Sequence, residues 1–73
     1  MTARLVALIL VALAHIAHAQ QGDTAEAGKR FNAGVALYSE ADYRAALVEF
    51  KRAYDIAPNP AVLYNIGQTQ YQL

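Results

Sequence analysis

The chain divides into one unbroken apolar run and three segments in which apolar residues recur periodically. Residues 5–17 are apolar except for His15. Further on, apolar positions recur every three or four residues, which places them on one face of an α-helix. They are Phe31, Gly34, Val35 and Tyr38 in one segment, and Tyr43, Ala46, Leu47, Phe50, Ala53 and Tyr54 in the next. The sequence therefore predicts an all-α fold.

Residues near the start of the first periodic segment predict where its helix begins. Asp23 precedes Glu26 by three positions, which is the spacing of a capping box. Glu26 and Arg30 are four residues apart, so their side chains can pair on the helix surface. We expect this helix to run from about Thr24 to Tyr38.

Two short polar stretches predict the connections between the helices. Residues 39–42 carry cap-forming side chains at both ends, so the second helix begins at Tyr43. Pro58 disfavours the α conformation at Ala57 and ends that helix. Asn59 is a good N-cap residue, and Pro60 suits the first helical position because it needs no amide donor there. A third helix is expected from Pro60 to the end of the sequence.

The apolar run has the layout of a secretory signal peptide. A short segment with one positive charge, Arg4, precedes it, and Ala17 and Ala19 supply the small residues that a signal peptidase recognises. We expect residues 1–19 to be removed by cleavage between Ala19 and Gln20. An uncleaved membrane anchor is the alternative, but a span needs about 20 apolar residues. The expected product is exported, and periplasmic or secreted if the source is bacterial.

The composition excludes several classes of partner and anchor. The whole chain has a formal net charge of zero, and loss of Arg4 with the signal leaves about −1. This balance provides no electrostatic attraction for nucleic acid, and contact with a membrane is expected only transiently, through the signal. The chain has no cysteine, which excludes both a lipoprotein anchor and disulfides. The exported part is therefore expected to pack weakly by itself.

A motif recurs within the exported part. Phe31-Asn32-Ala33-Gly34 reappears as Tyr64-Asn65-Ile66-Gly67, displaced by 33 residues, and Tyr38 matches Tyr71 under the same shift. A period of this length with two helices in each unit indicates a helix-turn-helix solenoid.

In these positions the chain resembles the tetratricopeptide repeat family. The family's small, aromatic, alanine and terminal proline positions are occupied at the family's spacings by Gly34, Tyr43, Ala46, Phe50, Ala53 and Pro58, and Gly67 repeats the first of them. The sequence departs from the family at Arg30 and Leu37, where large aromatic residues are common. The resemblance implies about one and a half repeats: residues 20–26 form a linker and the start of the first helix, 27–59 one full repeat, and 60–73 the first helix of a second.

The resemblance also implies a groove. In this family the first helix of each repeat lines a concave surface that holds a peptide. The corresponding positions in this chain are Phe31, Val35, Tyr38, Ser39, Tyr64, Gln68, Tyr71 and Gln72. Alternatively, Phe31, Val35 and Tyr64 serve only to pack against neighbouring helices. Asn32 and Asn65 can contact a ligand, but bracing the repeat is the expected role.

Catalytic chemistry has little support in the residues that follow the signal. His15 and His18 lie within the signal, so Ser39, Thr24 and Thr69 have no imidazole base in the exported part. The neighbouring carboxylates Glu40 and Asp42 are explained by a solvated turn, and scattered carboxylates make a poor metal site. We expect no enzyme activity, no metal and no other cofactor.

The sequence therefore predicts an exported scaffold that mediates protein–protein interaction. Its partner is expected to be another protein or peptide, or a second copy through self-association. Three alternatives remain: a non-binding structural spacer, the N-terminal module of a longer envelope protein, and an accessory module of a longer enzyme.

Overall fold

The computed structural model describes residues 22–73, which form three helices and no strand. The first helix covers residues 22–39, α2 spans Tyr43–Ile56 and α3 spans Pro60–Gln72. The all-α prediction is therefore confirmed for this part of the chain. The expected signal peptide and its cleavage site at Ala17, Ala19 and Gln20 lie outside the described residues.

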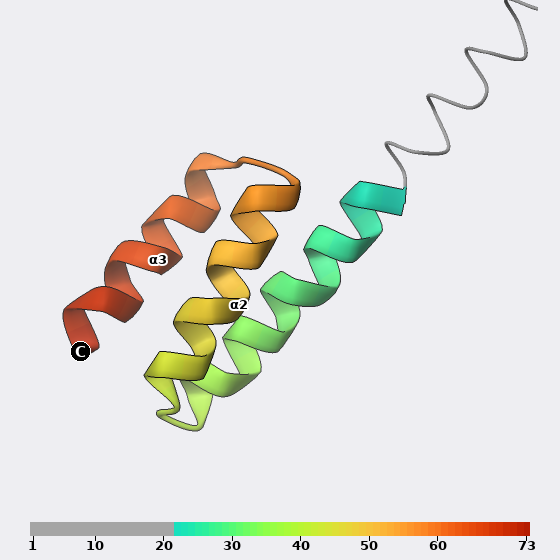
Figure 1. Ribbon diagram of the computed structural model, residues 1–73. Coiled ribbons are helices and arrows are strands. Elements are labelled where there is room, and N and C mark those ends of the chain that lie inside the picture. The colour runs from blue at the N-terminus through green and yellow to red at the C-terminus, as the bar shows by residue number, and fades with distance from the viewer. Residues whose placement is uncertain (1–21) are drawn as a thin grey trace, which may run out of the picture.

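The three helices pack side by side with α2 between the other two (Figure 1). Short connections force consecutive helices to run antiparallel. As a result, the first helix and α3 point in the same direction, and α2 runs in the opposite direction between them (Figure 1). None of the helices in the described part of the chain is both long enough and apolar enough to span a membrane.

The predicted start of the first helix was wrong. Gly22 and Asp23 are already helical, so Asp23 is not an N-cap. Ala25, Glu26 and Ala27 are strong helix formers. Once a helix is nucleated, each further residue adds a hydrogen bond at little cost, and this offsets the weak propensities of glycine and aspartate. The predicted pair is confirmed, because Arg30 Nε donates to Glu26 Oε1 at 3.1 Å.

The first helix ends in a Schellman motif built around Ala41. The amide of Asp42 donates to the carbonyl of Leu37 at 2.9 Å, and the amide of Ala41 donates to that of Tyr38 at 3.0 Å. These two bonds satisfy carbonyls that the helix end leaves without partners. The motif requires a left-handed residue, and Ala41 adopts φ 61°. Glycine usually occupies this position because a Cβ is strained there.

Replacing Ala41 with glycine is therefore expected to stabilise the fold. The gain from removing the Cβ strain, about 1–2 kcal/mol, exceeds the loss from a more flexible unfolded chain, about 0.5–1 kcal/mol. We expect the free energy of unfolding to rise by about 0.5–1 kcal/mol, measured by urea denaturation. Ala36→Gly, in the body of the first helix, is the matched control and should destabilise. A loss of stability in Ala41→Gly would contradict the assigned strain.

The ends of α2 and α3 agree with the sequence-based prediction. The Asp42 side chain accepts a hydrogen bond from the Ala45 amide, and the Asn59 side chain accepts one from the Ala61 amide at 2.8 Å. Both contacts satisfy amides in the first helical turn, as N-caps do. Ala57, which precedes Pro58, leaves the helical region with φ −140° and ψ 89°. Pro60 occupies the beginning of α3, where no amide donor is needed.

The core lies along α2. Its buried residues are Ala46, Phe50 and Ala53, and α3 adds Val62 and Ile66. Alanine at two of these positions lets the neighbouring helices approach closely, while Phe50 fills the remaining space. Thr69 of α3 is also fully buried, and its hydroxyl donates to the Asn65 carbonyl at 2.6 Å. This bond offsets the cost of burying a polar group.

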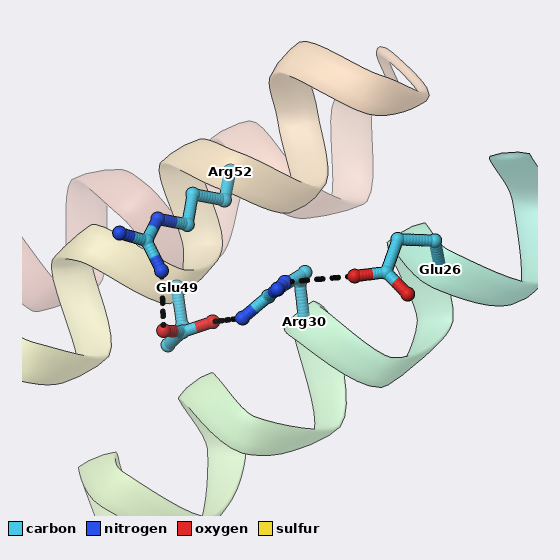
Figure 2. A network of polar contacts seen from close by, with 4 residues as sticks. All are labelled: Glu26, Arg30, Glu49 and Arg52. Carbon is cyan, nitrogen blue, oxygen red and sulfur yellow. Dashed lines mark hydrogen bonds and ion pairs between the residues drawn. The ribbon is translucent and has the colours of Figure 1, made fainter.

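A chain of ion pairs joins the first helix to α2 at the surface (Figure 2). Arg30 bonds both Glu26 of its own helix and Glu49 of α2, at 3.1 and 3.4 Å. Glu49 also accepts from Arg52 at 3.3 Å. Pairs this exposed each contribute at most about 1 kcal/mol. The Arg30–Glu49 contact nevertheless crosses between the helices and favours one rotational setting of the first helix against α2.

Candidate functional site

A hollow of about 120 Å³ opens between the first helix and α3. The first helix supplies Val35, Tyr38 and Ser39, and α3 supplies Asn65 and Gln68. Phe50 of α2 also lines it, and because Phe50 is only 1% exposed it forms the floor. The hollow therefore lies where two parallel helices flank the central one, and none of its lining residues is charged.

The first-helix side of the hollow is held by local contacts. Ser39 Oγ donates to the Val35 carbonyl one turn earlier, at 3.0 Å. The Tyr38 ring packs edge-on against that of Tyr43, with 5.1 Å between centroids. Gln72 Nε2 reaches across from α3 and donates to the Tyr38 hydroxyl at 3.4 Å. This last contact connects the two walls directly, 34 residues apart in sequence.

The α3 side presents two amide groups. Asn65 Nδ2 donates to the Ala61 carbonyl at 2.9 Å, and Gln68 Nε2 donates to the Tyr64 hydroxyl at 2.7 Å. Asn65 thus braces its own helix through its nitrogen. Within residues 22–73, nothing donates to Oδ1 of Asn65 or to Oε1 of Gln68. Both oxygens can therefore accept hydrogen bonds from a bound molecule.

The structure brings together only some of the predicted groove residues. Val35, Tyr38, Ser39 and Gln68 line the hollow, and Gln72 bonds to Tyr38 at its edge. Tyr64 and Tyr71 lie outside it and are 67% and 89% exposed. Phe31 also lies outside it: its ring packs against that of Phe50 with 5.6 Å between centroids, and it lines a different hollow. Asn65, whose expected role was bracing, is a lining residue as well.

A larger hollow of about 310 Å³ was not predicted from the sequence. It lies where the early part of the first helix meets the end of α2 and the beginning of α3. Most of its lining residues are small, and this is the feature of the sequence that could have indicated it. The small residues are Ala27, Gly28, Ala53, Ala57 and Ala61, and the others are Thr24, Phe31, Asn59 and Val62. Its two polar lining residues are Thr24 and Asn59, and the Asn59 side chain is engaged as the N-cap of α3.

The predicted repeat-packing residues occupy different environments. Gly34 meets Phe50 directly: a Cβ added at Gly34 would lie 2.6 Å from the Phe50 ring. Ala46 and Ala53 are buried on the same helix as Phe50, and Tyr43 is half-buried. Pro58 is exposed in the connection to α3. Gly67 is also exposed, and a Cβ there would meet no atom within 4 Å.

Apolar, hydroxyl and amide side chains line the hollow. The described residues contain no group of three or more histidine, cysteine, aspartate or glutamate side chains that could hold a metal. Phe50 forms the floor of the hollow and Val35 part of one wall, and the side-chain oxygens of Asn65 and Gln68 can accept hydrogen bonds. Comparison of the chain with protein-family models, with curated proteins and with solved structures gave no match.

Proposed function

We propose that this chain is an exported scaffold, similar to tetratricopeptide-repeat proteins, that binds another protein through a short peptide segment. The observation that carries the proposal is the convergence of Val35 and Tyr38 from one helix with Gln68 from another on a single hollow. These residues are far apart in sequence but occupy matching helices of the internal repeat. The motif shared by residues 31–38 and 64–71 supports the same reading.

The chemistry of the hollow suits an uncharged peptide. A space of about 120 Å³ accommodates one apolar side chain of moderate size against Phe50. The oxygens of Asn65 and Gln68 flank it and can accept backbone amide hydrogen bonds from the same segment. Export is proposed from the signal-like layout of residues 1–19.

Two valines with nearly equal exposure provide a matched test. Val35 lines the hollow and is 43% exposed, whereas Val48 lies on α2 away from it and is 48% exposed. Val35→Glu places a charge in an uncharged site, where a bound apolar group would desolvate it. We expect at least about a tenfold loss of affinity, equivalent to about 1.4 kcal/mol, for peptides selected from a random library against the whole chain.

Val48→Glu should change the same affinity by less than about twofold, because Val48 does not line the hollow. Fluorescence anisotropy with the selected peptides measures both variants, and circular dichroism checks that each retains the parent's helicity. Equal losses in the two variants, or a library that yields no binding peptide, would contradict the proposed groove.

A further inference from the structure

The expected cleavage product begins with glutamine. Cleavage between Ala19 and Gln20, after the small residues that a signal peptidase recognises, makes Gln20 the first residue of the exported chain. The next residue, Gln21, is also glutamine, so cleavage one position later would still expose a glutamine. Both residues lie outside the part of the chain that the structure describes.

An N-terminal glutamine can cyclise without any other reactant. The unprotonated α-amino nitrogen attacks Cδ of the side-chain amide, and the new N–Cδ bond closes a five-membered lactam, pyroglutamate. The bond from Cδ to the amide nitrogen breaks, and that nitrogen leaves as ammonia with a proton from the amine. The α-amino group of a peptide titrates near neutral pH, so a substantial part of it is unprotonated there. Both reacting groups belong to one residue, which favours the intramolecular step.

The first helix begins close to this new terminus. Gly22 is already helical, and residues 22–25 are all exposed. Burial begins only at Ala27, which is 8% exposed. Little burial therefore opposes the opening of the first turn. Exposed chain ends of this kind are where proteolysis concentrates.

Residues just inside this end contribute to the packing of the first helix. Glu26 accepts a hydrogen bond from Arg30 at 3.1 Å, and Arg30 also bonds Glu49 of α2 at 3.4 Å (Figure 2). Ala27 follows as the first buried residue of the chain's described part. Removal of residues from the N-terminus up to Glu26 would take away one of the two carboxylates that hold Arg30, together with the first turn of the helix.

We propose that Gln20 of the exported chain is converted to pyroglutamate, and that this ring protects the first helix from aminopeptidases. These enzymes bind the free α-amino group of their substrate, whereas the nitrogen of the lactam is an uncharged amide. Cyclisation also removes a positive charge from the N-terminal end of the helix, where the macrodipole disfavours cations. The proposal rests on the export and cleavage proposed above and is independent of the peptide groove.

Intact mass spectrometry of the protein collected after export tests the modification. The whole chain, residues 1–73, is expressed in a bacterial host that exports it. The expected mass is that of residues 20–73 less one ammonia, and N-terminal sequencing should be blocked until pyroglutamyl aminopeptidase is added. Gln20→Ala should have the full mass of residues 20–73 and a free amine. Gln21→Ala, the matched control, should again lack one ammonia.

The mass separates failure of this proposal from failure of the cleavage on which it rests. A parent protein that consists of residues 20–73 and retains the ammonia would overturn the modification and leave export intact. A chain that keeps residues 1–19 would overturn both. Loss of ammonia in Gln20→Ala equal to that in the parent would place the reaction at another residue and would also overturn the proposal.

An aminopeptidase challenge tests the protective role. The exported parent and both variants are incubated with an aminopeptidase of broad specificity, and the intact mass is followed over time. We expect Gln20→Ala to lose its intact mass at least about tenfold faster than the parent, and Gln21→Ala to match the parent. Circular dichroism checks that all three proteins start with equal helicity. Equal rates for Gln20→Ala and the parent would show that the ring does not protect the helix.

Discussion

Replacing Phe50 with alanine is expected to remove most of the free energy of unfolding of this chain at 25 °C. The Phe50 side chain is 1% exposed, packs against Phe31 and covers Gly34. Truncating a buried phenylalanine costs about 3–5 kcal/mol. At roughly 0.05–0.15 kcal/mol per residue, a domain of this size has about 3–8 kcal/mol of stability in total. One substitution therefore removes most of it.

Helix content measured by circular dichroism at 222 nm, followed through urea denaturation, checks this expectation. Val48→Ala is the control because Val48 lies on the same helix and is 48% exposed. It should change the free energy of unfolding by no more than about 0.5 kcal/mol. A cooperative transition in Phe50→Ala within 1 kcal/mol of the parent would show that Phe50 is not the centre of the core.

Gly34→Val is expected to destabilise the fold by about 3 kcal/mol. A Cβ at this position would already lie 2.6 Å from two carbons of the Phe50 ring, and valine adds two methyl groups beyond it. Phe50 is only 1% exposed, so its ring cannot move away from Gly34 without disturbing its packing against Phe31. Overpacking of this kind typically costs about 1–3 kcal/mol and occasionally more.

Gly28→Val is the matched control for this prediction. Gly28 lies in the same helix, is exposed, and has no atom within 4 Å of an added Cβ. Valine and glycine differ little in helix propensity, so we expect a change within about 0.5 kcal/mol. Thermal unfolding of both variants compares them directly. Equal effects at the two glycines would mean that backbone propensity, and not contact with Phe50, explains the cost at Gly34.

The proposed groove rests on contacts that local sequence signals do not encode. Resemblance to a repeat family placed Val35, Tyr38, Ser39 and Gln68 on one surface, and these residues do line a common hollow. The same resemblance grouped Tyr64 and Tyr71 with them, but these two tyrosines lie outside it. The difference arises from the rotation of α3 about its axis, which is determined by the burial of Val62, Ile66 and Thr69 against the core.

Short-range chemistry was sufficient to predict α2 and α3. Their N-caps at Asp42 and Asn59, and the break at Pro58, act through hydrogen bonds and steric clashes between residues at most four apart. The Glu26–Arg30 pair has the same range. Such interactions depend on the neighbouring residues alone, so the sequence determined these helices and the apolar face of α2.

Only the tertiary structure decided which residues far apart in the sequence contact each other. The pairing of Arg30 with Glu49, the bond from Gln72 to Tyr38, and the contact of Gly34 with Phe50 join residues 16 to 34 positions apart. The left-handed residue of the turn after the first helix is Ala41, and because glycine does not occupy this position the sequence did not predict the turn. The order in which the three helices pack determines these contacts, and it also leaves Gly67 open while its counterpart Gly34 is covered.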